Sequence, residues 1–394
     1  MHEDNFILNA ARLNLSEENI AALRKIPKKN IDWPLFERKA FAHGVDTFIY
    51  YSLKNNNLSE LIPPETYKRF QEQYYEVAYQ NSVFLEKVDK LSAIINDKIV
   101  LLKGIDLTQS LYPNIAIRSM VDIDILVENG KEYDIWNKLK QNGFKDLNVY
   151  ASKSSVHIPA VPTPSIQNPN DLNAERPHHF PGLDDESCHV EVHWNIFPEF
   201  SNLTDKAWEN AVLLNSNRKI YRLSIEFLLL HLCSHFWCHN CQQDASLRQL
   251  CDINELIIKH INSLDWNEIN TICLNKEFKK RVTSTLTYSH VLFNTTVPEN
   301  FIDEEFIKRN SFNFDIFLEG MSKSHFSTYQ TTFRSINRTS DKIIFIFRTV
   351  IPLKDWINAH YQTHSRIELL KAYFKYWLYL FNSHLFKRKM HLGN

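Results

Sequence analysis

The sequence predicts an α+β protein in which a small mixed β-sheet domain lies between mostly helical N- and C-terminal regions. Three observations support this prediction. Glycine is scarce, at 7 of 394 residues, while aromatic residues make up 13% of the chain, as in ordered, helix-rich proteins. Short apolar or alternating runs near residues 99–127 and 188–194 predict strands. We therefore expect a helical region over 1–95, an α/β domain over 96–200 with an irregular excursion over 151–186, and a helical domain over 201–394.

Helix start and stop signals define the N-terminal region. Ser16 precedes an apolar helical period that Pro27 ends. Asp32 precedes Trp33-Pro34, and proline is favoured at the first positions of a helix. Pro63-Pro64 begins a third, long helix that we expect to run to about Asn96.

The centre of the chain alternates between strand and helix signals. Residues 99–102 are short, apolar and β-branched, which predicts a buried strand that ends at Lys103-Gly104. A helix is expected over 105–112, an alternating strand over 121–127, and a second helix over 131–141 that Gly143 terminates. This order within about 50 residues indicates a small α/β unit.

The remainder of the chain is predicted to be helical from about Thr204 onward, with helix caps at Ser224 and Ser246. Before this helical region, residues 188–194 alternate like a strand. The last expected helix, 367–386, is rich in aromatic residues, which we interpret as a surface for helix packing.

Composition excludes several classes of function. The chain has 45 Lys and Arg against 46 Asp and Glu, so it lacks the positive excess of a general polyanion binder, and nucleic acid is an unexpected though not excluded partner. The glycines are too widely spaced for a G-x-G-x-x-G fingerprint or a Walker A loop. No signal peptide precedes the first helices and the apolar runs are too short for a bilayer, so we expect a cytoplasmic protein without membrane contact.

Two aspartates on one predicted strand are the first candidate for chemistry. Asp122 and Asp124 are two residues apart, so both side chains project from one face, while Val121, Ile123 and Ile125 are expected to project from the other, into the core. A divalent cation would relieve the repulsion between the two carboxylates, and oxygen ligands of this kind suit Mg²⁺ or Mn²⁺. The alternative is a solvated edge strand that carries two aspartates.

A second strand carries a matching polar face. His189, Glu191 and His193 share one face of residues 188–194, opposite Val190 and Val192. If this strand pairs beside the first, Glu191 becomes a third carboxylate that either completes a metal site or serves as a base.

Lys103 and Gly104 end the preceding strand. A glycine there lets backbone N–H groups approach an anion, and Lys103 adds a positive charge. Arg118 could bind a phosphate, or it could form a salt bridge with Asp122 or Asp124.

Histidines and cysteines cluster in the C-terminal region. Cys233, Cys238 and Cys241 have a spacing that a metal cluster or a zinc site could use, but we interpret them as buried structural cysteines. His231 and His235 are one helical turn apart and could ligate a metal together. Arg248 and Asp252 are also one turn apart, which predicts a helix salt bridge; the alternative is that His235, Arg248 and Asp252 face the site from across a cleft.

These motifs together resemble a known family. Leu101-Leu102-Lys103-Gly104, the strand Val121-Asp122-Ile123-Asp124-Ile125-Leu126-Val127, and Val190-Glu191-Val192-His193-Trp194 are similar to the signature of an uncharacterised bacterial nucleotidyltransferase family within the polymerase-beta-like superfamily. The similarity extends to further residues along most of the chain: Asp32-Trp33, His43-Gly44-Val45, His231, His235, Arg248, Asp252, Pro352, Trp356 and Tyr361.

The resemblance implies an enzyme that moves a nucleoside monophosphate from an NTP, with ATP expected, to a hydroxyl of a small molecule. It implies that Asp122, Asp124 and Glu191 are catalytic and bind Mg²⁺ or Mn²⁺. The implied nucleotide-binding residues are Lys103, Gly104, Arg118, His193, His235, Arg248 and Asp252.

One departure from the superfamily leaves other functions open. Gly104-Ile105 stands where many members have Gly-Ser, so a hydroxyl contact to phosphate is missing. The alternatives are a nucleotide- or partner-binding module without turnover, a transferase that modifies RNA or protein, or a zinc protein built on the His/Cys cluster.

Overall fold

A computed structural model of the chain describes residues 2–146, 179–180, 182–185, 187–197, 199–242, 245–310, 317, 370–371 and 373–374. The chain forms two compact units, one made of residues 1–144 and 176–324 and the other of residues 145–175 and 325–394. In the second unit the described residues are β3 (Lys145–Asp146) and the helical residues Leu370, Lys371, Tyr373 and Phe374. Most of the helix expected over 367–386 therefore lies outside the described residues. All that follows concerns the first unit.

The N-terminal region is helical, as the sequence predicts. Ser16 caps its helix by accepting a hydrogen bond from the backbone N–H of Asn19 at 3.2 Å, and Asp32 accepts from Leu35 at 2.9 Å. The longest helix has 32 residues and ends at Asn96, whose φ of 52° is left-handed. The elements are α1 (His2–Ala10), α2 (Glu17–Lys25), η1 (Lys28–Asn30), α3 (Trp33–Ala42), α4 (Asp46–Asn55), η2 (Ser59–Leu61) and α5 (Pro64–Ile95).

A mixed sheet forms the centre of the unit and confirms the α+β class. Its strands lie in the order β4-β5-β2-β1-β7-β6. The pairs β2·β5 and β1·β7 are parallel, and β1·β2, β4·β5 and β6·β7 are antiparallel. The elements are β1 (Ile99–Leu101), α6 (Lys103–Ser110), β2 (Asp122–Leu126), α7 (Glu132–Gln141), β4 (Leu183–Asp184), β5 (His189–His193), α8 (Ser201–Glu209), β6 (Val212–Asn215), η4 (Ser216–Arg218) and β7 (Ile220–Arg222).

Three local predictions were wrong. The segment after residue 204 is not wholly helical, because β6 and β7 form a hairpin whose inner strand extends the sheet beside β1. Val121 does not belong to the core; it precedes β2 and is 69% exposed. The helix expected over 105–112 spans Lys103–Ser110, so Lys103 and Gly104 form its first turn instead of the end of the preceding strand.

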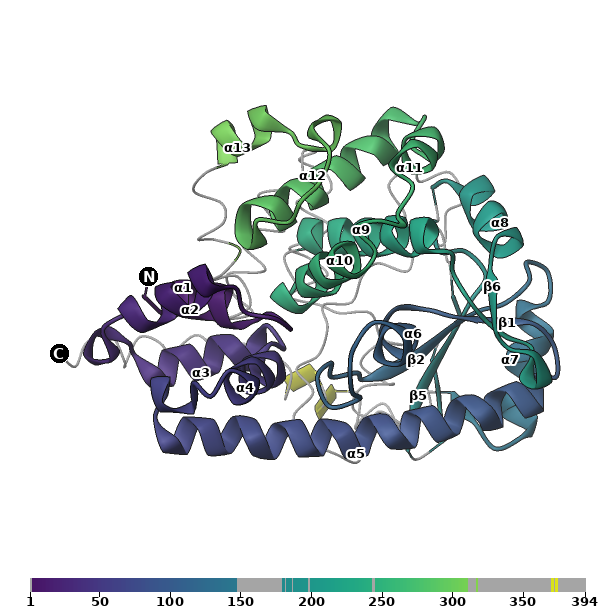
Figure 1. Ribbon diagram of the computed structural model, residues 1–394. Helices are drawn as coiled ribbons and strands as arrows, with labels where there is room; N and C mark the ends of the chain where they lie inside the picture. Colours follow the sequence, from purple (N-terminus) through teal and green to yellow (C-terminus); the bar gives the residue numbers. More distant parts are fainter. Residues whose placement is uncertain are drawn as a thin grey trace. The chain divides into compact units, whose positions relative to one another are not determined.

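The sheet buries one face and leaves a polar strip on the other. Apolar side chains of β1, β2 and β5 pack against the second half of α5 and against α7: Ile99, Leu101, Ile123, Ile125, Val190 and Val192. Because strand side chains alternate, Asp124, Glu191 and His193 project from the opposite face. In Figure 1, α5 passes along one side of β2 and β5, while α6, α9 and α10 lie on the other side.

The C-terminal helices of this unit share an apolar core with the N-terminal helices. Phe6, Phe36 and Phe48 belong to the same buried cluster as Phe236 and Phe278. The elements are α9 (Ile225–Gln242), α10 (Leu247–Lys259), α11 (Trp266–Ile272), α12 (Lys276–Phe293), η5 (Glu299–Phe301) and α13 (Glu304–Asn310). The division at residues 95 and 200 stays a prediction.

Candidate active site

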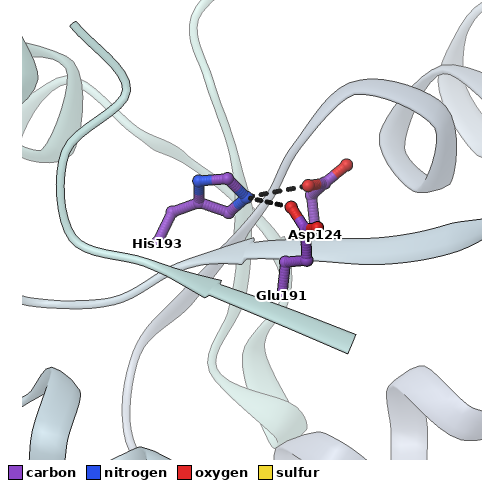
Figure 2. Close-up of side chains that lie close together, drawn as sticks. All are labelled: Asp124, Glu191 and His193. Atoms are coloured by element: carbon purple, nitrogen blue, oxygen red, sulfur yellow. Dashed lines mark hydrogen bonds and ion pairs between the residues drawn. The ribbon is translucent and has the colours of Figure 1, made fainter. Parts of the chain in front are cut away.

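The pairing register of β2 and β5 brings the candidate side chains together. Asp124 lies opposite Glu191, and Leu126 lies opposite His193. The His193 Nε2 atom is 2.8 Å from Asp124 Oδ1 and 3.3 Å from Glu191 Oε2. Figure 2 shows the imidazole pointing at both carboxylates. Asp124 and His193 are buried, and Glu191 is partly exposed. The polar strip is therefore an ordered group of interacting side chains.

Lys103 joins this group from the start of α6. Its backbone has a φ of 44°, a left-handed conformation that is uncommon for a residue other than glycine and is found frequently at functional sites. Its Nζ lies 2.9 Å from Asp124 Oδ1, the same oxygen that His193 contacts. The preceding residue, Leu102, donates its backbone N–H to the carbonyl of Asp124 at 3.1 Å. The end of β1 is thereby fixed to the centre of β2.

The charges in this group shift its acidities in opposite directions. Burial by itself raises the pKa of Asp124, but Lys103 and the hydrogen bond from His193 outweigh it and bring the pKa down to about 2. Burial and the neighbouring Asp124 raise the pKa of Asp122 to about 6. Burial likewise opposes ionisation of Glu191, yet hydrogen bonds from His189 and His193 lower its pKa. Asp122 therefore takes up a proton more readily than Asp124, which lies two residues further along β2.

The histidines of β5 are held by carboxylates on either side. Burial disfavours the charged form of His193, but its bonds to Asp124 and Glu191 raise its pKa. His189 lies with Nδ1 3.0 Å from Asp184 Oδ1 and Nε2 3.6 Å from Glu191 Oε1. These contacts outweigh burial and raise the pKa of His189 to about 9.

Asp124, Glu191 and His193 could hold a metal ion, since one ligand atom from each lies within 4.8 Å of the others. The sequence predicts Asp122, Asp124 and Glu191 as the metal ligands. The structure brings Asp124 and Glu191 together with His193, and this group does not include Asp122. Asp122 is the first residue of β2, opposite His189, and is partly exposed beside the group.

Arg118 does not pair with Asp122 or Asp124. Its Nε is 3.1 Å from each carboxylate oxygen of Asp252, and its Nη2 is 2.9 Å from Oδ2. Tyr112 donates its hydroxyl to the same carboxylate. The side chain of Arg118 is therefore engaged by α10.

The predicted i, i+4 salt bridge between Arg248 and Asp252 was also wrong. Arg248 Nη1 donates instead to Ser119 Oγ at 2.7 Å and to the Ser119 carbonyl at 2.9 Å. Both residues of α10 thus bind the segment that enters β2.

That segment, residues 113–121, is held from other helices as well. Asn81 of α5 donates to the carbonyls of Ile115 at 2.6 Å and Arg118 at 2.8 Å. Thr47 of α4 donates to the carbonyl of Ile117. Sequence reasoning missed Thr47, Asn81 and Tyr112, because single polar residues on helices carry no motif.

Gly104 lies where a side chain would not fit. A Cβ atom built there would be 2.5 Å from Arg118 Nη1 and 2.9 Å from Met120 Cγ. The backbone of α6 therefore packs directly on the Arg118 side chain. This explains the glycine by packing, whereas its contact with nucleotide stays a prediction.

Two histidines of α9 belong to the same electrostatic environment. Burial lowers the pKa of His231 to about 3, and the charges of Lys103 and His193 add to this. Burial also lowers the pKa of His235 well below its usual value, with Lys103 contributing next. Both shifts favour the uncharged form of the rings, and both ring nitrogens of His231 are buried without a hydrogen-bond partner among the described residues.

Comparison with known proteins identifies the family. A family model described as an uncharacterised nucleotidyltransferase matches residues 29–294. The chain belongs to this family. The match runs from before α3 to the end of α12, so it includes the whole polar strip and the helices around it. No curated protein and no solved structure matches the chain.

The cysteine cluster shows no sign of a metal site in the part of the chain that the structure describes. Cys233 is buried in the apolar core, and none of the described cysteines belongs to a possible metal-binding group. The side chain of Cys241 lies outside the described residues. No described helix is long and apolar enough to cross a membrane.

Proposed function

We propose that this nucleotidyltransferase moves a nucleoside monophosphate from an NTP to a hydroxyl group of a small molecule, as polymerase-beta-like enzymes do. The observation that carries the proposal is the register of β2 and β5. It places the carboxylates of Asp124 and Glu191 side by side on the polar face of the sheet, with Lys103 against them. ATP is the expected donor, and the charge balance of the chain favours a small acceptor over RNA.

The reaction needs few groups from the protein. The acceptor oxygen attacks the α-phosphorus, the bond between the α- and β-phosphates breaks, and pyrophosphate leaves. A divalent cation, Mg²⁺ or Mn²⁺, supplies charge stabilisation when bound, and Asp124 and Glu191 would hold it with Asp122 beside them. The acceptor proton passes to a carboxylate of the site, Asp122 or Glu191. Lys103 binds the negatively charged phosphates.

Label transfer tests the proposal. Each α-labelled NTP is incubated with the protein, Mg²⁺ or Mn²⁺, and small molecules extracted from cells. We expect a labelled product with the wild type and a loss of about 100-fold or more in rate with Asp124→Asn. Asp97→Asn is the matched control, because Asp97 is a half-exposed aspartate that pairs with Lys131.

The result also separates the alternatives. Equal transfer by Asp124→Asn would refute the assigned site. Tight NTP binding by the wild type without transfer to any acceptor would indicate a binding module. Label that appears in RNA or protein would identify a macromolecular acceptor instead.

A further inference from the structure

We call Asp124, Glu191 and His193 the metal-binding group. The donor atom that His193 would supply is a nitrogen. His193 directs Nε2, rather than a carbon edge of its ring, at both Asp124 and Glu191 (Figure 2). It is buried, with 4% of its surface exposed. A buried imidazole aimed between two carboxylates either holds them in place by hydrogen bonds or binds a metal together with them.

The spacing of the three atoms fits a single small ion. An octahedral ion with bonds of about 2.1 Å places neighbouring donor atoms about 3.0 Å apart. The observed separations from His193 Nε2 are 2.8 Å to Asp124 Oδ1 and 3.3 Å to Glu191 Oε2. His193 Nε2 is therefore spaced from each carboxylate oxygen as neighbouring ligands of one ion are, and all three donor atoms lie within 4.8 Å of one another.

The donor types favour one class of metal. Mg²⁺ selects oxygen ligands and water, whereas imidazole suits first-row transition metals. We propose that His193 is a metal ligand and that the Asp124-Glu191-His193 group binds a first-row transition-metal dication in preference to Mg²⁺. This rests on the proposed function, because a nucleotidyl transfer at this strip is what requires a metal there.

Neighbouring groups are compatible with this assignment. His231 is buried and neutral, so it adds no positive charge against a cation. Lys103 shares Asp124 Oδ1 with His193, but its ammonium is on a flexible stem and Asp124 has a second oxygen. The sequence alone concealed this role, because His193 lies in the same motif as Glu191 and three carboxylates already satisfied the expected ligand count.

Electron paramagnetic resonance tests the ligand directly. Mn²⁺ is added to the metal-free full-length protein, and electron spin echo modulation detects nitrogen bound to the ion. We expect ¹⁴N modulation in the wild type, its replacement by a ¹⁵N pattern in protein labelled at histidine, and its loss in His193→Gln. The labelled wild type keeps the test valid if the variant folds poorly.

Affinity and selectivity give a second readout. The concentration of free Mn²⁺ is measured from its electron paramagnetic resonance signal in solution. We expect His193→Gln to weaken Mn²⁺ binding by about tenfold or more. We expect Mg²⁺ to displace Mn²⁺ from the wild type only at an excess of about 100-fold or more. The matched control is His260→Gln, at a half-exposed histidine after α10 whose Nδ1 lies 3.2 Å from Ser263 Oγ and which is outside the metal-binding group; this variant should keep both the modulation and the affinity.

Failure of this inference differs from failure of the proposed function. Any of four results would overturn the inference about His193. They are Mn²⁺ binding without nitrogen modulation, modulation that persists in His193→Gln, equal affinity for Mg²⁺ and Mn²⁺, and the absence of Mn²⁺ binding. Transfer of α-label with Mg²⁺ in such a case would leave the proposed function intact. Nitrogen modulation in a protein that transfers no label would support the metal site and refute the function.

Discussion

Replacing Asp252 by asparagine removes the carboxylate that forms an ion pair with Arg118 while keeping the size of the side chain. Asp252 is fully buried, with 0% of its surface exposed, and Arg118 is 8% exposed. The variant leaves the guanidinium of Arg118 buried against a neutral amide that can accept hydrogen bonds through one oxygen only. Tyr112 also loses its charged acceptor.

The expected cost follows from the burial of this pair. Removing one partner of a buried ion pair costs about 3–5 kcal/mol, because the other charge is left without compensation. Three nitrogen–oxygen contacts between 2.9 and 3.1 Å join the pair, so we expect about 3 kcal/mol. The control is Asp97→Asn. Asp97 and Lys131 are 42% and 47% exposed, and breaking such a surface pair costs less than about 1 kcal/mol.

Urea-induced unfolding, followed by tryptophan fluorescence, measures both changes. With an m-value of about 3 kcal/mol/M, Asp252→Asn should lower the midpoint by about 1 M. The double variant Arg118→Met/Asp252→Asn should be more stable than Asp252→Asn alone, because it removes the unbalanced charge. A loss no greater than that of Asp97→Asn, or no recovery in the double variant, would refute the reasoning.

Three further predictions concern α6, whose first turn carries Lys103. Gly104→Ala should lower the free energy of unfolding by about 1–3 kcal/mol, since its Cβ would lie 2.5 Å from Arg118 Nη1. Gly130→Ala is the control, because a Cβ built at Gly130 meets nothing within 4 Å. Its φ of 92° should lower the free energy of unfolding by only about 1 kcal/mol, and equal losses for the two variants in chemical denaturation would contradict the packing argument. Burial raises the pKa of Asp106 to about 6, so its ionisation destabilises the folded state progressively as pH rises from about 4 to 6. Asp106→Asn should lack this loss and be about 3 kcal/mol more stable at pH 7.5 but unchanged at pH 4; the same pH slope in both proteins would argue against it. Lys103→Met should weaken NTP binding about tenfold in calorimetry, because it removes a cation that binds phosphate. Without nucleotide, Mn²⁺ should bind this variant equally or more tightly, because the cation removed lies 2.9 Å from Asp124. Weaker Mn²⁺ binding would count against Lys103 as a phosphate-binding residue.

Alternation along β2 and β5 made much of the site predictable. A period of two separates Ile123 and Ile125 from Asp122 and Asp124, and it separates Val190 from Glu191 in the same way. The structure confirms the two strands and the helices α6 and α7 that follow β1 and β2. Sequence periodicity shows which face a side chain occupies.

Periodicity does not show which residues meet. The parallel register puts Asp124 opposite Glu191 and places His193 Nε2 2.8 Å from Asp124 Oδ1. This register depends on how two segments that are distant in the sequence align, which periodicity within each segment does not determine. The pairing of Arg118 with Asp252 spans 134 residues and was equally hidden. The short strands β6 and β7 were missed because strands of three or four residues carry too little pattern, and every residue of β6 is exposed.

The position of the transferred label tests the central claim most directly. The protein is incubated with ATP labelled at either the α- or the γ-phosphate, together with the acceptor fraction that supports transfer. Nucleotidyl transfer predicts that the acceptor product carries the α-label and never the γ-label, that γ-label is released as pyrophosphate, and that Glu191→Gln abolishes both signals. A product that carries the γ-label, with ADP released, would show phosphoryl transfer and contradict the account.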